Sequence, residues 1–169
     1  MTLITYYTFA ESPLGPLQLI SDGVALTGLF MNEHKNGPGM GEDWVRDDTH
    51  ALLTEARQQI IAYFGGERKT FDLPLAPGGT AFQRRVWDAL GTIPYGTTIS
   101  YGELARRIGD PKASRAVGLA NGSNPISIIV PCHRVIGANG KLTGYGGGIE
   151  RKKALLALEA TAEPTLTLL

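Results

Sequence analysis

Short apolar runs separated by turns make up the first thirty residues of the chain. Apolar and β-branched residues gather at positions 4–9, 17–21 and 25–31, and segments with proline or glycine at 12–16 and 22–23 lie between them. Runs of this length, bounded by turn residues, predict three strands of a small antiparallel sheet. Residues 32–48 are polar, glycine-rich and aperiodic, which predicts a mobile loop without recognisable chemistry.

A helical periodicity follows this segment. Apolar residues recur at every fourth position, and these are Leu52, Ala56, Ile60 and Phe64. The spacing predicts an amphipathic helix over residues 50–64 that covers the sheet and ends at the glycines 65 and 66. Proline and glycine then cluster at 74–79, and we expect the boundary between two domains there, after residue 78.

The helix predicted at the start of the second half has a clear beginning. Thr80 and Gln83 have the spacing of a capping box, in which each side chain satisfies a backbone N–H at the helix start. Phe82, Val86 and Leu90 form its apolar stripe. A continuous apolar run at 126–130 predicts a buried strand or extended segment, and residues 149–159 predict a final helix.

Two short helices are predicted between these elements. A second capping box, at Ser100 and Glu103, predicts a helix that Gly109 ends. Asp110 followed by Pro111 predicts the start of the next helix. Together they form a helix-turn-helix candidate over about residues 100–121, a pattern that ordinary helical hairpins share.

These elements predict an α+β protein with two domains. The first, at 1–78, is a small N-terminal α/β domain with a short antiparallel sheet. The second, at 79–169, is a mostly helical C-terminal domain that contains the helix-turn-helix.

The charges are divided unevenly along the chain. Sixteen Lys and Arg balance sixteen Asp and Glu, which leaves no net charge. Residues 1–79 hold five basic and ten acidic side chains, a balance of −5, whereas residues 80–159 hold eleven basic and five acidic ones, a balance of +6. A local positive field acts over a Debye length whatever the total charge, so the second half is suited to a polyanionic partner. Charges that segregate without a partner are the alternative interpretation.

The single cysteine excludes an intramolecular disulfide and indicates a reducing compartment. The sequence does not open on a charged leader followed by a long apolar stretch, and no run approaches the roughly 18 apolar residues of a membrane span. We therefore expect a cytoplasmic protein with no membrane partner.

Cys132 is the strongest candidate for chemistry, because it follows a buried apolar segment and precedes a histidine. A cysteine is nucleophilic as the thiolate, so it needs a base or cation nearby, and His133 is the obvious candidate. Adjacent side chains point to opposite faces of a regular strand, so their cooperation requires the chain to turn at Pro131. A small buried cysteine beside a core histidine is the alternative, and the residues alone leave both open.

A histidine base is usually oriented by a third group, most often a carboxylate. Glu159 closes the last predicted helix and is placed to fold back onto the Cys132 segment, although a solvated carboxylate at a helix end is the alternative. One cysteine and three scattered histidines offer no metal-ligand spacing, so we expect no metal.

The segment from Pro131 to Gly137 reads Pro-Cys-His-Arg-Val-Ile-Gly and resembles the active-site signature of the O6-alkylguanine-DNA alkyltransferases, also called methylated-DNA–protein-cysteine methyltransferases. The resemblance continues through an ordered series of motifs over the last half of the chain. These motifs lie at 79–83, 86–87, 93–96, 101–102, 114–118, 124–125 and 145–148, and the series ends at Glu159. The first half resembles the family only loosely, mainly at 12–16.

The resemblance implies a repair reaction without a cofactor. The alkyl group of O6-alkylguanine, and of O4-alkylthymine, would move irreversibly to Cys132, once per protein molecule. His133 would activate the thiol, and the family links this histidine through a water to Glu159. Tyr101 would donate a hydrogen bond to N3 of the flipped guanine and ease its departure as an anion. Asn124 would brace the catalytic segment and tie it to the DNA-binding helices.

The resemblance also implies a partner, double-stranded DNA with an alkylated guanine, bound through its minor groove by the second helix of the helix-turn-helix. Arg115 would fill the space left by the extruded base, because an alkyl group on guanine O6 cannot meet a cysteine inside a stacked duplex. Ser114, Ala116 and Gly118 are small enough to permit close approach, and Tyr101 lies on the preceding helix. We expect a monomer and leave open cooperative assembly on DNA.

A substrate pocket formed by Val135, Tyr145, Gly146 and Gly147 is implied as well, with backbone groups near Cys132 and Val135 reading the exocyclic amine of the guanine. Several family members have a serine where this chain has Gly146, and the more flexible loop leads us to expect tolerance of bulkier alkyl groups. Some relatives carry zinc in their first domain, but this chain lacks the cysteines for it.

Two other functions compete with this interpretation. A lesion-binding protein without transfer activity would lack the cysteine, as alkyltransferase-like relatives do, whereas Cys132 is present here. A cysteine hydrolase using Cys132 and His133 would turn over repeatedly and would have no use for a basic helix-turn-helix or for Arg115. The resemblance thus implies a single-turnover methylated-DNA–protein-cysteine S-methyltransferase.

Overall fold

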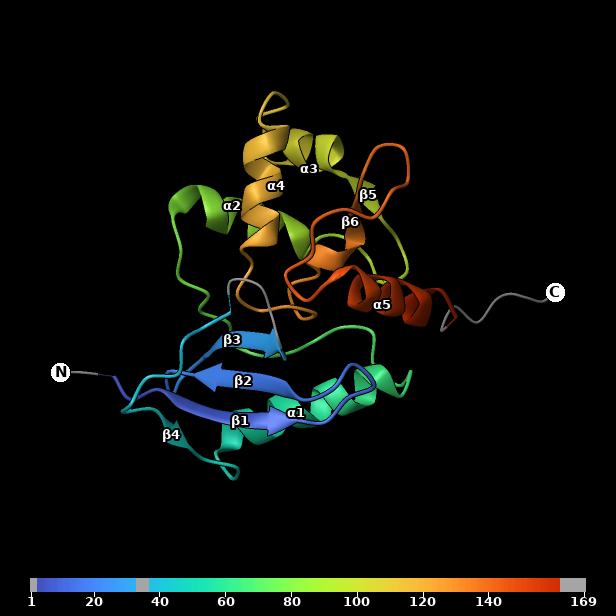
Figure 1. The fold of residues 1–169 in the computed structure, drawn as a ribbon. Helices are drawn as coiled ribbons and strands as arrows, with labels where there is room; N and C mark the ends of the chain where they lie inside the picture. The colour runs from blue at the N-terminus through green and yellow to red at the C-terminus, as the bar shows by residue number, and fades with distance from the viewer. Residues whose placement is uncertain (1–2, 33–36, 162–169) are drawn as a thin grey trace. The chain divides into compact units, whose positions relative to one another are not determined.

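The structure is a computed structural model that describes residues 3–32 and 37–161 and divides into two compact units (Figure 1). Unit 1 comprises residues 1–79 and 125–129, and unit 2 comprises residues 80–124 and 130–169. The elements of unit 1 are β1 (Tyr6–Ala10), β2 (Leu17–Ser21), β3 (Leu26–Met31), β4 (Val45–Arg46) and α1 (Ala51–Phe64). The elements of unit 2 are α2 (Ala81–Leu90), β5 (Ile99–Ser100), α3 (Tyr101–Arg107), α4 (Ser114–Gly122), the 3₁₀ helix η1 (Cys132–Arg134), β6 (Val135–Ile136) and α5 (Ile149–Thr161). The predicted α+β fold class is confirmed.

Unit 1 is built on a four-stranded sheet with the strand order β3-β2-β1-β4. The first three strands pair antiparallel, with Thr8 opposite Leu19 and Leu19 opposite Leu29, so the three predicted strands are confirmed. The short strand β4 pairs parallel with β1 and lies inside the segment predicted as a loop. The prediction of a mobile loop also covers residues 33–36, which lie outside the described residues.

Helix α1 covers one face of this sheet (Figure 1). Its buried residues are Leu53, Ala56, Gln59, Ile60 and Tyr63. The predicted stripe is right at Ala56 and Ile60, whereas Leu52 and Phe64 are only half-buried. A helix turns once in about 3.6 residues, so a strict four-residue spacing drifts away from the buried face. Gly65 caps the helix, as predicted.

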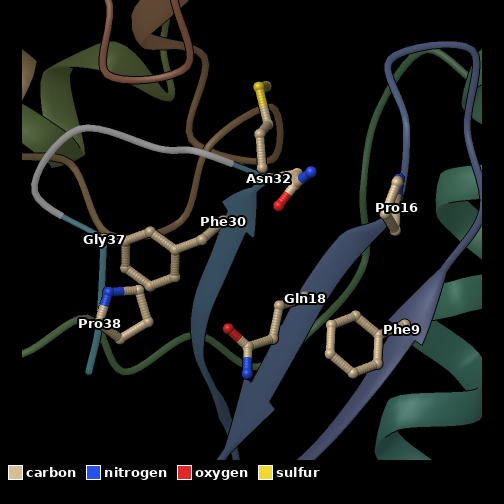
Figure 2. Close-up of a pocket in the computed structure, with 8 residues that line it drawn as sticks. Phe9, Pro16, Gln18, Phe30, Asn32, Gly37 and Pro38 are labelled. Carbon is tan, nitrogen blue, oxygen red and sulfur yellow. The ribbon is translucent and has the colours of Figure 1, made fainter. Parts of the chain in front are cut away.

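The opposite face of the sheet carries a pocket of about 300 Å³ (Figure 2). It is lined by Phe9, Pro16, Gln18, Phe30, Met31, Asn32, Gly37 and Pro38. Phe9 lies opposite Gln18 and Gln18 lies opposite Phe30 in the strand register, so their side chains project from the same face. None of the predicted site residues lines this pocket, and its lining has no ionisable side chain.

Two segments far apart in the sequence cover the outer edge of β3. The backbone N–H of Leu26 donates to the carbonyl of Pro74 at 2.8 Å. Further along the strand, the N–H of Leu29 donates to the carbonyl of Pro125 at 2.9 Å, and the N–H of Ser127 donates back to Leu29 at 3.2 Å. Residues 125–129 thus belong to unit 1, although the residues on both sides belong to unit 2. The predicted division into domains 1–78 and 79–169 does not include this return of residues 125–129 to unit 1, and it stays a prediction.

Residues 126–130 do not form the predicted strand. Only Ile126 makes a bridge to β3. The N–H of Ile129 then donates to the carbonyl of Ser127 at 2.8 Å in a γ-turn around Ile128, whose φ is +73°. The run is apolar because most of it is buried, and burial alone does not distinguish a strand from an irregular segment.

Unit 2 packs its helices around a core of large apolar side chains. Its fully or almost fully buried residues include Val86, Trp87, Leu90, Ile93, Leu104, Val117, Val135 and Leu155. Phe82 of the predicted α2 stripe is only half-buried. The first capping box is confirmed, because Thr80 Oγ1 accepts from the Gln83 N–H at 3.1 Å and Gln83 Oε1 accepts from the Thr80 N–H at 2.9 Å. The predicted last helix is α5. No helix within 3–32 and 37–161 is long and apolar enough to cross a membrane.

Helices α3 and α4 pack on each other as the predicted helix-turn-helix. At the start of α3, Ser100 Oγ accepts from the Glu103 N–H at 3.0 Å. The second half of the predicted capping box is wrong, because the Glu103 carboxylate instead pairs with Arg106 and Arg107. Charge attraction within the helix therefore competes with the cap for this carboxylate.

The turn between the two helices depends on glycine. Gly109 has a φ of +83°, and the N–H of Asp110 donates back to the last turn of α3 at 3.0 Å, as in a Schellman motif. The predicted start of α4 at Asp110 and Pro111 is wrong. The carbonyl of Asp110 accepts from the Ala113 N–H at 3.0 Å in a further turn, and the helix begins only at Ser114.

Candidate active site

A tight turn at Pro131 places Cys132 and His133 in one short 3₁₀ helix. Pro131 has φ −82° and ψ 65°, and the N–H of Cys132 donates to the carbonyl of Val130 at 2.8 Å, which is the geometry of an inverse γ-turn. All three side chains of η1, from Cys132 to Arg134, are buried. The chain therefore turns at Pro131, as the predicted cooperation of the cysteine and histidine requires.

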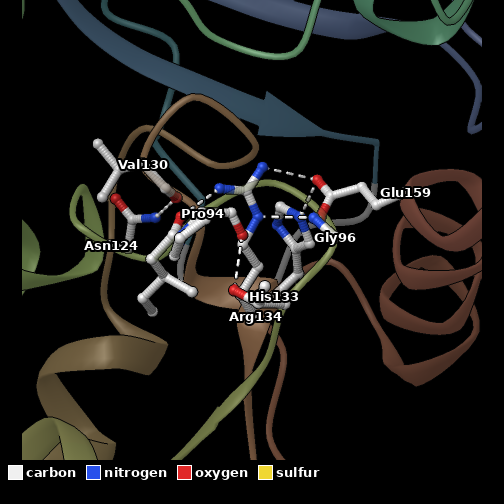
Figure 3. Close-up of polar contacts among 9 residues, drawn as sticks. Pro94, Gly96, Asn124, Val130, His133, Arg134 and Glu159 are labelled. Carbon is white, nitrogen blue, oxygen red and sulfur yellow. Dashed lines mark hydrogen bonds and ion pairs between the residues drawn. The ribbon is translucent and has the colours of Figure 1, made fainter. Parts of the chain in front are cut away.

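Two asparagines, one in the last turn of α4 and one just after that helix, hold this segment. Asn124 Nδ2 donates to the carbonyl of Val130 at 2.8 Å (Figure 3), and Asn121 Nδ2 donates to the carbonyl of Cys132 at 3.3 Å. Both side chains are buried. Asn124 thus contacts the segment that it is predicted to brace. No role for Asn121 is predicted from the sequence, because an asparagine inside a helix gives no sign of a partner eleven residues away.

Glu159 accepts hydrogen bonds from two neighbouring side chains of η1 (Figure 3). Its Oε2 lies 2.8 Å from His133 Nε2 and 2.9 Å from Arg134 Nη2, and its Oε1 lies 2.9 Å from Arg134 Nε. The side chains of His133 and Glu159 are 0% and 1% exposed. The predicted water between histidine and glutamate is therefore wrong, since α5 packs on η1 closely enough for a direct hydrogen bond.

Arg134 neutralises this buried carboxylate. Besides its two parallel hydrogen bonds to Glu159, it donates from Nη1 to the carbonyl of Ile93 at 2.7 Å, and its guanidinium lies 5.6 Å from the ring centroid of Tyr95. No role for Arg134 is predicted from the sequence. The available signal was its place in a buried segment, because an arginine in the interior needs an anionic partner.

Burial dominates the acidity of the candidate nucleophile. It raises the pKa of the Cys132 thiol to about 11, although a hydrogen bond from the Asn124 amide and the charge of Lys152 lower that pKa. Cys132 is therefore a neutral thiol near pH 7. A positioned base is needed to make it react.

The histidine is also neutral at rest. Burial lowers the pKa of His133, and the charges of Arg134 and Lys152 lower it further, while the hydrogen bond and charge of Glu159 raise it. A carboxylate only accepts hydrogen bonds, so Nε2 carries the proton of the neutral ring. Nδ1 is buried and hydrogen-bonds to no residue within the described ranges. It is therefore the nitrogen able to accept a proton.

An open pocket of about 440 Å³ adjoins the helix-turn-helix. It is lined by Tyr101, Ser114, Arg115, Gly118, Gly122, Thr143 and Gly144. Four of these seven are predicted site residues. The Tyr101 hydroxyl, predicted to donate to a guanine, donates here to the carbonyl of Thr143 at 3.1 Å. Ala116 is exposed on α4 but does not line the pocket.

Both halves of the chain match one protein family. Residues 81–161 match the family profile described as 6-O-methylguanine DNA methyltransferase, DNA binding domain, and residues 5–77 match the profile described as 6-O-methylguanine DNA methyltransferase, ribonuclease-like domain. The chain belongs to the 6-O-methylguanine DNA methyltransferase family. The resemblance inferred from its motifs is confirmed.

Individual members of this methyltransferase family are similar over almost their whole length. The methylated-DNA–protein-cysteine methyltransferase of Methanosarcina acetivorans is 54% identical over 156 residues, which cover 92% of this chain and 99% of the relative. The protein of the same name from Mycobacterium tuberculosis is 57% identical over 159 residues, 94% of each chain. A crystal structure of Mycobacterium tuberculosis OGT in complex with DNA matches with a TM-score of 0.87 and 56% identity, covering 94% of this chain and 95% of that one.

In this member of the methyltransferase family, the residues predicted to line the substrate pocket do not line the open pocket. Val135, Tyr145 and Gly147 are buried, and Gly146 is half-buried. Val135 pairs with β5 through β6, which keeps it in the interior. Thr143 and Gly144 of the same loop line the pocket instead. No group of three His, Cys, Asp or Glu side chains that would hold a metal occurs among the residues that the structure describes.

Proposed function

We propose that this family member repairs double-stranded DNA by moving the alkyl group of O6-alkylguanine, or of O4-alkylthymine, irreversibly to Cys132, once per protein molecule. Family membership supports repair of DNA by alkyl transfer. The observation that carries the choice of acceptor is the buried series Cys132, His133 and Glu159, with 2.8 Å between His133 Nε2 and Glu159 Oε2. Cys132 is also the sole cysteine of the chain.

The transfer starts from a thiol and ends with a thioether. The Cys132 sulfur forms a bond to the alkyl carbon while the bond from that carbon to the guanine oxygen breaks, and the electron pair of the broken bond leaves with the guanine. The thiol proton passes to His133 Nδ1, the imidazolium is stabilised by Glu159, and the proton ends on the departing base. Tyr101 assists by releasing Thr143 and donating its hydrogen bond to N3 of the guanine. The thioether offers no leaving path, so each molecule reacts once and needs no cofactor.

The high thiol pKa suits a reagent that must wait for one substrate. With a pKa of about 11, about one molecule in ten thousand carries a thiolate at pH 7. Cys132 is also 4% exposed, which protects it from electrophiles in solution. A reducing, cytoplasmic environment would keep this thiol available.

We place the DNA on α4. Arg115, Ser114 and Gly118 line the open pocket there, and Ala116 is exposed beside them. A helix with such small residues suits the narrow minor groove, and Arg115 is placed to occupy the space of an extruded base. The net charge of +6 over residues 80–159 supports a polyanionic partner. We propose that the chain binds this partner as a monomer.

Intact-protein mass spectrometry after incubation with a duplex containing one O6-methylguanine tests the proposal. We expect the mass of one methyl group to be added, the addition to stop at one per molecule, and the Cys132→Ala variant to gain none. Tight binding without any mass change would overturn transfer in favour of lesion recognition. Repeated turnover on a small ester would instead indicate a cysteine hydrolase. A second duplex with O4-methylthymine tests the wider substrate range.

Gly146 provides a separate expectation about the adduct. It is half-buried in the loop before α5, at the position where several family members have serine. Without a side chain the loop is more flexible, so we expect bulky adducts to be accepted. Transfer rates from methyl- and benzyl-guanine, compared in the parent chain and in Gly146→Ser, test this. An unchanged ratio of the two rates would refute it.

A further inference from the structure

Lys152 is a fully buried lysine that the reaction above does not use. Its residue is 0% exposed, and its Nζ donates to the carbonyl of Val135 at 2.7 Å and to the carbonyl of Thr143 at 2.9 Å. Lysine is almost never fully buried without a charged partner, and Lys152 makes no ion pair within residues 3–32 and 37–161. The next residue, Lys153, has a side chain that is 60% exposed. The burial of Lys152 is therefore a property of this position and not of the helix.

The charges around Cys132 leave that of Lys152 uncompensated. Arg134 and Glu159 neutralise each other through their two hydrogen bonds, and His133 is neutral at rest. The charged residues of α2 and α4, the other helices in contact with this segment, are all exposed: Arg84, Arg85, Asp88 and Arg115. A proton that moves from Cys132 to His133 therefore creates a thiolate and an imidazolium. The ammonium group of Lys152, whose charge lowers the pKa of Cys132, is a further counter-charge for that thiolate.

Lys152 also has a mechanical connection to the open pocket. The carbonyl of Thr143 accepts from both the Tyr101 hydroxyl, at 3.1 Å, and Lys152 Nζ, at 2.9 Å. When Tyr101 turns to the guanine, the carbonyl keeps only its bond to the lysine. The second bond, to Val135, joins the same ammonium group to β6, directly after η1.

We propose that Lys152 is a positioning residue with two tasks in the transfer proposed above: its charge stabilises the Cys132 thiolate as it forms, and its two hydrogen bonds hold the pocket loop at Thr143 once Tyr101 has turned to the substrate. The electrostatic contact is reciprocal, because Lys152 lowers the pKa of Cys132 and Cys132 raises the pKa of Lys152. Burial nevertheless lowers the pKa of Lys152 below its usual value. Attraction between the ammonium group and the Cys132 thiolate offsets this cost of burying the charge.

Two substitutions separate the two tasks. Lys152→Gln removes the charge and keeps N–H donors for the carbonyls, whereas Lys152→Met removes both. Cys132 is the sole cysteine, so its labelling rate with iodoacetamide as a function of pH reports this thiol alone. We expect its apparent pKa to rise by about one unit in both variants, which slows labelling about tenfold at pH 8. Hydrogen exchange in the loop 142–147 should accelerate only in Lys152→Met. The matched control, Lys153→Gln, should change neither.

Each outcome has a distinct meaning. An unchanged thiol pKa in Lys152→Gln overturns the charge task, and unchanged loop exchange in Lys152→Met overturns the positioning task. Labelling needs no DNA, so a chain that transfers no alkyl group at all would sink the proposed function while the labelling result still decides the charge task. If thermal melting finds the variants unfolded, NMR titration of Lys152 Nζ in the parent chain replaces them. The labelling rate of Cys132 in the parent chain should then rise by less than tenfold per pH unit above the pH at which Lys152 loses its proton, because the charge that stabilises the thiolate is lost there. An uninterrupted tenfold rise per pH unit through that pH overturns the charge task.

Discussion

Replacing Arg134 by methionine should destabilise this protein far more than the loss of a surface ion pair does. The change removes the guanidinium that neutralises Glu159, which is 1% exposed, and leaves in place its hydrogen bonds from His133 and the Gly96 N–H. Removing one partner of a buried pair costs about 3–5 kcal/mol, because the other charge stays in the interior unpaired. The carbonyl of Ile93 loses a donor as well, at about 1 kcal/mol. We expect the free energy of unfolding at pH 7 to fall by about 4 kcal/mol or more.

The pH dependence of this loss identifies its cause. In the unchanged protein the pKa of His133 is lowered, so below the unfolded value near 6.5 the unfolded chain binds a proton that the folded protein does not. Stability from this source is therefore lost as the pH falls from about 6.5 toward the folded pKa. Without Arg134, one cause of the lowering is gone and Glu159 raises the pKa of His133 with less opposition. The loss of stability between pH 7 and pH 5 should shrink or reverse.

Urea denaturation of four proteins, measured from pH 5 to pH 8, tests both statements. They are the unchanged chain, Arg134→Met, Glu159→Gln and the double variant. Each single change leaves one buried charge without its opposite charge, whereas the double change removes both charges, so its cost should be smaller than the sum of the single costs by about 1–3 kcal/mol. Arg46→Met is the control, because Arg46 and Asp48 form a pair whose side chains are both 54% exposed, and it should cost under about 1 kcal/mol. Additive single costs, with parallel pH curves for the parent and Arg134→Met, would refute the reasoning.

Further predictions concern the thiol, two helices and the DNA contact. Because the pKa of Cys132 is about 11, its iodoacetamide labelling rate should rise about tenfold per pH unit from pH 7 to 8, and a plateau in this range would contradict this. Thr80→Ala should lower the free energy of urea unfolding by about 1 kcal/mol through loss of the α2 cap, and no change would mean that the cap is redundant. Gly118→Ala would place a Cβ 3.8 Å from the Tyr101 ring, which is an ordinary contact, so calorimetry should find the fold stabilised by about 0.5–1 kcal/mol. The added methyl group should weaken DNA binding in a titration, and an unchanged affinity would argue against close approach of α4 to the DNA. Arg115→Ala, at an exposed position, should weaken binding of a lesion-containing duplex without changing the melting temperature, and a lower melting temperature would instead indicate a structural role.

The features that the sequence predicts well are those that a few neighbouring residues determine. The capping box of Thr80 and Gln83 and the turn at Gly109 depend on residues within one helical turn, and both have the expected geometry. The predicted start of α4 is wrong because a local pattern there is overruled by the next few residues. Asp110 and Pro111 suit a helix start locally, but a further turn at Ala113 delays it.

The candidate site depended on the family resemblance more than on the residues alone. From the residues alone, Cys132 and His133 fit either a catalytic pair or a buried cysteine beside a core histidine. Glu159 fits either a partner of His133 or a solvated carboxylate at a helix end. The contacts that define their surroundings span long separations: 26 residues from His133 to Glu159 and 41 from Arg134 to Ile93. Tertiary packing sets such contacts, and no local pattern encodes them. The role of Lys152 could not be predicted for this reason, since its helix contains two adjacent lysines and only packing distinguishes the buried one.

The excursion of residues 125–129 has a consequence for synthesis on the ribosome. Residues 1–79 emerge first, but the edge of β3 at Leu29 has no partner until Pro125 and Ser127 follow. At about 5–20 residues per second, the roughly fifty intervening residues take about 2–10 s to be translated. Throughout that interval the nascent chain exposes an open strand edge, which is a site for association with other chains. Unit 1 can complete its sheet only after the helix-turn-helix has been made, so a chain truncated after residue 79 should aggregate where the full-length chain does not.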